Sequence, residues 1–90
     1  MICLSIEIFG LVQGVFFRKS ATHRANELGL SGFIMNRPDG SVYAEVCGKE
    51  IAVNTLVDYC HTGPPAAQVS KVITNRITTR HTGPFVDKRF

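Results

Sequence analysis

The sequence lacks the long apolar stretches that a membrane span requires. Its hydrophobic runs fall far short of the roughly 20 residues needed to cross a bilayer. The first nine residues, Met1 to Phe9, contain no basic segment and carry Glu7, which is not typical of a secretory signal peptide. We therefore expect no membrane partner and a cytoplasmic location.

Closely spaced metal ligands are also missing. No CxxC or HxxxH spacing occurs among the cysteines and histidines, which are Cys3, Cys47, Cys60, His23, His61 and His81. A disulfide framework of the secreted type would need an even and denser set of cysteines. We expect no metal and no cofactor.

Positive charge is present, but no part of the chain concentrates it. Ten Lys and Arg residues against seven Asp and Glu give a net charge of +3, and no basic run is longer than a pair such as Lys88-Arg89. Nucleic-acid-binding proteins usually carry a basic patch or stripe. We expect no nucleic-acid partner and consider a small anion the better candidate ligand.

The chain is long enough for one domain. It has 90 residues, and a domain of this size buries only roughly 60–65% of the surface of its unfolded chain. No repeat, linker or low-complexity segment divides it. We expect residues 1–90 to form a single domain that works as a monomer.

Hydrophobic periodicity predicts the element order β-α-β-β-α-β. Residues 2–9 alternate with the period of a half-buried strand, whereas apolar residues from Phe17 recur at helical spacing until Gly29. The other predicted elements are strands at 32–36 and 42–47, a helix at 49–61, a strand at 68–80 and a short last strand within 85–90. This order indicates an α+β, ferredoxin-like βαββαβ sandwich, with two helices on one face of an antiparallel sheet of four to five strands.

This topology makes the first and third strands neighbours, which has a consequence for two cysteines. Cys3 begins the first predicted strand, Cys47 ends the third, and both fall on the face away from the helices. They are candidates for a disulfide. Two reduced thiols, as expected in a reducing cytosol, are the favoured interpretation.

The segment Gly10 to Arg18 joins a predicted strand to a predicted helix. Glycines at 10 and 14 allow the chain to curl until the free N–H groups of the helix start converge. Such a nest, backed by the helix dipole, suits a phosphate, and the Arg18 guanidinium could reach the same anion bidentately. On spacing alone an ordinary turn is the commoner explanation.

Two segments resemble the signature motifs of the acylphosphatase family. Gly10 to Arg18, GLVQGVFFR, is similar to G-x-V-x-G-V-x-F/Y-R, and Gly32 to Val42, GFIMNRPDGSV, is similar to G-aromatic-small-x-N-x-x-x-G-x-V. The likeness continues at Gly63 to Val69 and covers most of the chain, to about residue 77. Two long motifs in the right order on the expected elements are a specific signal.

The resemblance implies hydrolysis of acyl phosphates to a carboxylate and inorganic phosphate, without metal or cofactor. Arg18 would bind the phosphoryl oxygens and Asn36 would hold the attacking water. Backbone amides of the loop would complete the substrate site, at Val12, Gln13, Gly14, Val15, Phe16 and Phe17. The expected ligands are a small acyl phosphate and, as an inhibitory anion, phosphate or sulfate.

The chain departs from the family pattern at three places. Leu11 stands where a basic or polar residue is usual, and Ile34 where a smaller one is usual. In the tail, Asp87 or Lys88 falls where an aliphatic residue is expected, which leaves the register of the last strand open.

The sequence favours three other functions less. A cysteine phosphatase would need Cys-x5-Arg, which does not occur. An RNA- or metabolite-binding module would need aromatics on the open face of the sheet, where only Phe9 and Tyr43 are expected. A domain detached from a larger carbamoyl-phosphate-processing protein is a third possibility, which we rank below a free-standing enzyme.

Overall fold

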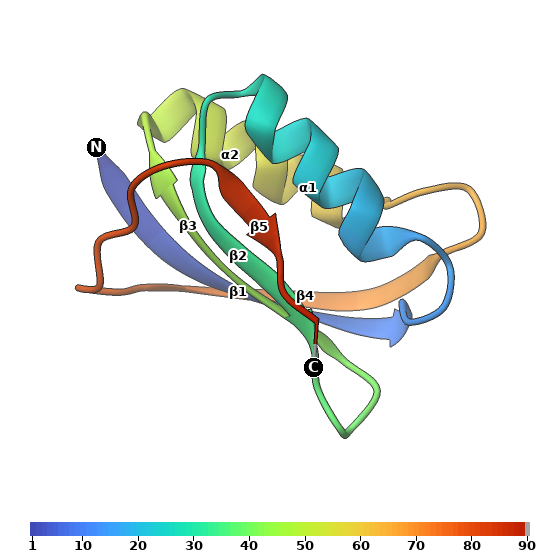
Figure 1. The fold of residues 1–90 in the computed structure, drawn as a ribbon. Helices are drawn as coiled ribbons and strands as arrows, with labels where there is room; N and C mark the ends of the chain where they lie inside the picture. The colour runs from blue at the N-terminus through green and yellow to red at the C-terminus, as the bar shows by residue number, and fades with distance from the viewer. Residues whose placement is uncertain (90) are drawn as a thin grey trace.

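The computed structural model describes residues 1–89. Five strands and two helices follow one another along the chain in an order that confirms the predicted β-α-β-β-α-β core and the short last strand (Figure 1). The elements are β1 (Ile2–Leu11), α1 (Phe17–Glu27), β2 (Ser31–Asn36), β3 (Val42–Gly48), α2 (Glu50–Cys60), β4 (Gln68–Arg76) and β5 (Phe85–Asp87).

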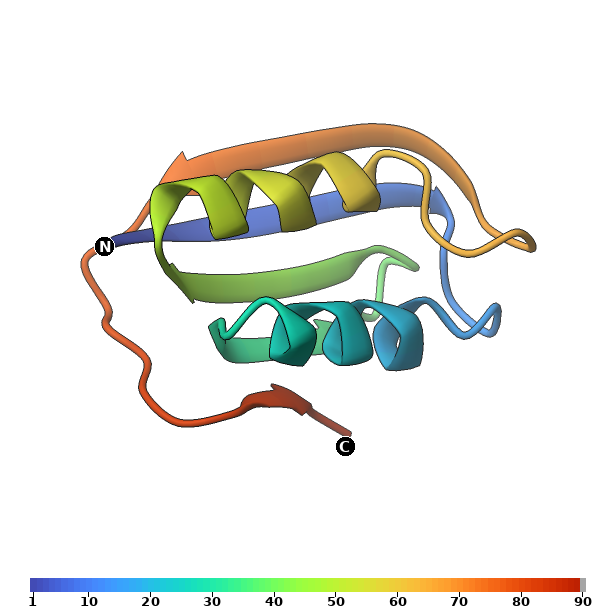
Figure 2. The same ribbon diagram turned by 90° about the horizontal axis from the view of Figure 1, so that it is seen from above.

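The strands form one sheet in the order β4-β1-β3-β2-β5, and both helices lie on one face of it (Figure 2). This is the predicted ferredoxin-like α+β sandwich. The expectation of a wholly antiparallel sheet is wrong at one edge, where β5 pairs in parallel with β2. Residues 77–84 carry the chain from β4, past the strand ends near the N-terminus, to the opposite edge, so β5 enters in the direction of β2 (Figure 2).

The core lies between the sheet and the helices. In β1, Ile6 and Ile8 are fully buried beneath the helices, as the period-2 alternation predicts. Helix α1 contributes Phe17 and two alanines, whose small side chains let it pack closely on the sheet. Besides Ile6, Ile8 and Phe17, the buried members of this cluster are Val12, Ala21, Ala25, Leu30, Ile34, Val42, Ala44, Val46, Val53, Leu56, Cys60 and Phe85.

Element boundaries differ from the sequence prediction at the ends of β1 and β4. The predicted loop begins at Gly10, but Gly10 and Leu11 still pair with β4 after a register shift between Phe9 and Gly10. Gly10 has φ 124°, and a Cβ there would lie 2.2 Å from the Gln68 carbonyl oxygen. Glycine is therefore required at this bulge for close strand approach. At the other boundary, β4 ends at Arg76 rather than at residue 80.

Cys3 and Cys47 are direct cross-strand partners of β1 and β3, as the topology predicted. Their sulfurs are joined in a disulfide, so the favoured interpretation of two reduced thiols is wrong for this structure. The segment 77–84 is hydrogen-bonded to the same end of the sheet. The Ile77 N–H donates to the Cys3 carbonyl over 3.1 Å, and the His81 N–H donates to Cys47 Sγ over 3.3 Å.

The open face of the sheet carries three aromatic side chains rather than the two expected. Phe33 joins Phe9 and Tyr43 because Gly32 and Ile34, its neighbours in β2, face the helices. Cationic groups lie over these rings: the Arg37 guanidinium is 5.9 Å from the Phe9 ring centre and 5.4 Å from that of Tyr43.

Candidate active site

The loop between β1 and α1 is curled by two residues in left-handed backbone conformation. Gly14 has φ 73°, and Phe16, the residue that caps α1, has φ 64°. Glycine adopts this region freely, whereas a bulky residue does so only where the surrounding structure imposes it. Phe16 is also 75% exposed, so burial of its ring does not explain the conformation.

The same loop leaves its amides free. Within residues 1–89, the backbone N–H groups from Val12 to Lys19 donate no hydrogen bond to another protein group outside the strand ladder. The first amide of α1 to do so is that of Ser20, which donates to the Phe16 carbonyl over 3.0 Å. The first turn of α1 contains no acidic residue that would neutralise the positive end of the helix dipole. Free amides at a helix start are a ready site for an anion.

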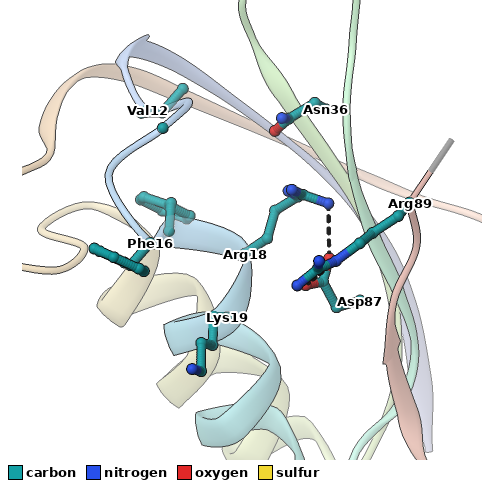
Figure 3. A pocket seen from close by; sticks show the side chains of 9 residues that line it. Val12, Phe16, Arg18, Lys19, Asn36, Asp87 and Arg89 are labelled. Atoms are coloured by element: carbon teal, nitrogen blue, oxygen red, sulfur yellow. Dashed lines mark hydrogen bonds and ion pairs between the residues drawn. The ribbon is translucent and has the colours of Figure 1, made fainter.

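A cavity of about 310 Å³ lies at this helix start. It is bounded by the loop, the first turn of α1, the end of β2 and the tail that follows β5 (Figure 3). Its lining residues are Val12, Gly14, Phe16, Phe17, Arg18, Lys19, Asn36, Asp87 and Arg89. Arginine and lysine supply three of the charges and Asp87 the fourth, which gives the lining a net positive charge that favours an anionic ligand.

Arg18 reaches into the cavity from the first turn of α1. Its Nη1 donates to Asp87 Oδ1 over 2.9 Å and, more weakly, to the Lys88 carbonyl over 3.4 Å. Its Nε and Nη2 have no acceptor among residues 1–89. One edge of the guanidinium therefore remains free for a two-pronged contact with an anion.

Asn36 is the last residue of β2 and enters the cavity from the opposite side to Arg18 (Figure 3). Its Oδ1 is buried and has no hydrogen-bond partner in the described part of the chain. Buried polar atoms are almost always paired with protein groups or water. Asn36 lines the same cavity as Arg18, and its unpartnered carboxamide oxygen makes it a candidate for contact with a water molecule or a ligand.

The β2–β3 turn holds the loop in place through Gln13. The Gln13 Nε2 donates to the carbonyl oxygens of Arg37 and Ser41, over 2.8 and 2.9 Å. Hydrogen bonds from the Ser41 hydroxyl and amide lower the pKa of Asp39 and stabilise this turn. These hydrogen bonds therefore connect the segment that follows Asn36 to the loop that precedes Arg18.

The structure gathers most of the site residues expected from the sequence. Arg18, Asn36, Val12, Gly14, Phe16 and Phe17 all line the cavity, whereas the Gln13 side chain turns toward the β2–β3 turn and Val15 packs against the core. Sequence reasoning missed the other lining residues, Lys19, Asp87 and Arg89. The tail departs from the family pattern at Asp87 or Lys88, but nothing in the sequence places Asp87 beside Arg18.

In the described part of the chain, no three His, Cys, Asp or Glu side chains come together as a candidate metal-ion cluster. None of the helices within residues 1–89 has both the length and the apolar character needed to cross a bilayer.

A sheet covered on one face by two helices, with a curled loop at the start of the first helix, defines an α+β protein of the ferredoxin-like class. Comparison with known proteins identifies the group to which it belongs. The acylphosphatase family model matches residues 4–88, which is nearly the whole chain. The chain therefore belongs to the acylphosphatase family.

Individual relatives agree with this assignment. An acylphosphatase from an Acidovorax species is 51% identical over 67 residues, which cover 74% of this chain and 69% of that protein. One from Photobacterium profundum is 40% identical over 84 residues, covering 93% of both. The solved structure of an acylphosphatase from Coxiella burnetii superposes with a TM-score of 0.92 at 34% identity, covering 97% of this chain and 92% of that one. The protein is thus an enzyme that hydrolyses acyl phosphates.

Proposed function

We propose that Arg18 and the free amides of residues 12–17 bind the phosphoryl group of the acyl phosphate, and that Asn36 positions the water that attacks phosphorus. The observation that supports this most directly is that Arg18, Asn36 and residues of the loop with unpaired amides line one cavity, and that Asn36 Oδ1 has no hydrogen-bond partner within residues 1–89. No group in this arrangement requires a metal or cofactor.

The division of labour follows from the chemistry of phosphoryl transfer. The transition state is loose and carries negative charge on the equatorial oxygens, so positioning and electrostatic stabilisation provide most of the catalysis. Amides and a guanidinium that are already oriented need no reorganisation as this charge develops. The N-terminal end of α1 adds its dipole to the same region.

A neutral carboxamide suits the task assigned to Asn36. Its Oδ1 can accept a hydrogen bond from water and so aim a water lone pair at phosphorus. A carboxylate at this position would repel the incoming phosphoryl dianion. A strong general acid is unnecessary, because the leaving group is itself a carboxylate of low pKa.

Three further properties belong to this proposal. Inorganic phosphate or sulfate should occupy the same loop and inhibit, because each matches the tetrahedral shape and charge of the phosphoryl group. We propose that residues 1–90 act as a single domain and as a monomer. A cytoplasmic location also remains our proposal.

The test is a steady-state assay with benzoyl phosphate on the wild-type protein, Arg18→Ala and Arg18→Lys. Loss of one preorganised donor typically costs about a hundredfold to a thousandfold in rate, and we expect that loss for Arg18→Ala. Lysine should restore little, since it cannot make the two-pronged contact. The circular dichroism spectrum should be unchanged. An Arg18→Ala variant that keeps most of its turnover would overturn the proposal.

Asn36→Ala separates the two roles. Because the proposed partner of Asn36 is water, the variant should lose turnover while inhibition by phosphate stays close to that of the wild type. Treatment with EDTA should leave the rate of both proteins unchanged. Equal losses of turnover and phosphate affinity would show that Asn36 binds the phosphoryl group instead.

A further inference from the structure

Asp87 is the one carboxylate that lines the cavity within residues 1–89, and it contacts the residue proposed to bind phosphate. A negative charge is unexpected in a site for a dianion, so its presence needs a reason. We propose that Asp87 is a positioning residue: it holds Arg18 by Nη1 and thereby directs the Nε–Nη2 edge of the guanidinium at the phosphoryl group. This inference rests on the proposed function and assigns a role to a residue that the sequence motifs do not include.

The contact uses only one corner of the guanidinium. Asp87 Oδ1 and the Lys88 carbonyl both accept from Nη1, at 2.9 and 3.4 Å, which occupies that nitrogen. A carboxylate competing with substrate would be expected to take the two-pronged edge, as carboxylates prefer with arginine. Here that edge is left open. The geometry is that of a support for Arg18 rather than of an internal inhibitor.

Arg18 has two reasons to need such a support. Its side chain is long and flexible, so an unsupported guanidinium would lose rotamer freedom whenever it bound an anion. It also stands in the first turn of α1, where the positive end of the helix dipole disfavours a cation. A carboxylate beside Nη1 counters both effects. The side chains of Arg18 and Asp87 are 25% and 17% exposed, so water screens the pair only in part.

The pairing of β5 with β2 connects this support to the other half of the site. Asp87 pairs with Ile34, and the Lys88 N–H donates to the Ile34 carbonyl over 2.8 Å. Asn36 follows Ile34 by two residues on the same strand. Asp87 therefore fixes the guanidinium relative to the strand that carries the proposed water-binding carboxamide (Figure 3).

Asp87 also has a second cationic neighbour, Arg89, whose Nε lies 3.6 Å from Asp87 Oδ2. Figure 3 shows the Arg18 and Arg89 side chains converging on Asp87, while Lys19 points away from them. Because Arg89 is three-quarters exposed, its contact is the weaker of the two. Arg89 thus contacts Oδ2 of the Asp87 carboxylate, and Oδ1 is directed at Arg18.

The experiment compares Asp87→Asn and Asp87→Ala with the wild type in the benzoyl phosphate assay. Alanine removes the acceptor and should lower kcat about tenfold, the rate equivalent of a hydrogen bond to a charged group. The KM should stay level or fall, because a negative charge near the substrate is lost. Asparagine keeps an acceptor oxygen and should recover most of kcat. Asp58→Asn on α2, an exposed site with the same charge change, is the matched control and should behave as wild type.

A double variant, Arg18→Ala with Asp87→Ala, tests whether Asp87 acts through Arg18. If it does, the second substitution should cause no further loss of kcat in the Arg18→Ala background. Additive losses would overturn the inference. So would a rise of kcat, or a lower KM with unchanged kcat, in both Asp87 variants, which would identify Asp87 as a competing anion.

The remaining outcomes are also decisive. Thermal unfolding of each variant is followed alongside, and a loss of kcat that tracks a loss of folded protein, without recovery in Asp87→Asn, would assign Asp87 a merely structural role. If Arg18→Ala is inactive while Asp87→Ala is fully active, this inference fails and the proposed function stands. If Arg18→Ala is itself fully active, the proposed function fails.

Discussion

The two ends of the central strands are built in opposite ways. At the end where β1 begins, a disulfide joins Cys3 to Cys47, and His81 Nε2 contacts Glu45 at 2.8 Å. At the other end, where β1 gives way to α1, the loop amides are unpaired, Asn36 Oδ1 has no partner within residues 1–89, and Phe16 holds a left-handed conformation. At the first end the strands are covalently joined and Glu45 is paired with His81, whereas the other end leaves several polar groups without a protein partner in the described residues.

The difference shows how a small protein can maintain an unsatisfied site. Unpaired buried polar groups and a strained backbone cost free energy, and a chain of 90 residues has only a modest core to offset that cost. The covalent and ionic contacts at the opposite end stabilise the sheet without touching the cavity. Stability and activity should therefore respond separately to changes at the two ends.

Removal of the disulfide should have the largest effect on stability. Cys3 and Cys47 are 44 residues apart in sequence, and closing a loop of that size stabilises the folded state by about 4 kcal/mol in the chain-entropy treatment. We expect dithiothreitol to lower the free energy of unfolding by about this amount in a urea titration. The kcat on benzoyl phosphate at room temperature should remain that of the oxidised protein, since the bond lies at the far end of the strands.

The double variant Cys3→Ala, Cys47→Ala is the control. It should show the lower stability without reductant and no further change when dithiothreitol is added. Cys60, which burial keeps as a neutral thiol by raising its pKa to about 12, should remain unreactive toward alkylating agents in the folded protein. A fall in kcat on reduction, with the protein still folded, would show that the two ends are coupled.

The fold could be predicted from the sequence because its signals are local and repeated. The alternation in β1 and the helical spacing from Phe17 each recur several times, and each is confirmed. The cross-strand placement of Cys3 and Cys47 followed from topology alone. Whether their sulfurs are bonded did not follow, because the pattern fixes the proximity of two thiols and not their oxidation state.

The candidate site was only partly predictable, for a physical reason. Arg18 and Asn36 lie within long motifs, and both line the cavity. Asp87 reaches Arg18 across 69 residues of sequence, and that contact depends on the parallel register of β5 on β2. A three-residue edge strand carries too little periodicity to reveal its register or direction.

Substitution of Phe16 probes the end of the sheet that carries the cavity. Its effect on stability should be smaller than that of removing the disulfide, and of the opposite sign. The left-handed conformation costs a non-glycine residue about 1–2 kcal/mol. Glycine avoids this cost, but it loses about 0.5–1 kcal/mol on folding because its unfolded chain has more conformational freedom. We expect Phe16→Gly to raise the free energy of unfolding by up to about 1 kcal/mol and to lower kcat, because a looser loop orders its amides less well. Both are measured by urea titration and the benzoyl phosphate assay.

Phe16→Ala is the matched control, because it removes the exposed ring but retains the cost of left-handed conformation at a residue with a Cβ. It should gain no stability. If alanine stabilised the protein as much as glycine does, the ring rather than the backbone would be the source of strain.

Glu45→Gln tests the end of the sheet that carries the disulfide and should have the smallest effect on stability. Burial alone would raise the pKa of Glu45, but hydrogen bonds from Tyr43 and His81, together with the positive charges of His81 and Lys88, outweigh it and lower the pKa. A depressed carboxylate pKa contributes stability that is present above about pH 4.5 and is lost as the pH falls through the folded-state value.

For a partly exposed pair we expect the Glu45→Gln variant to be less stable than the wild type by about 1 kcal/mol or less near pH 6. The gap should close on acidification below pH 4.5, as followed by urea titrations at a series of pH values, while kcat near pH 6 stays unchanged. A gap that persisted in acid would mean that the Glu45 side chain contributes by packing and not by its charge.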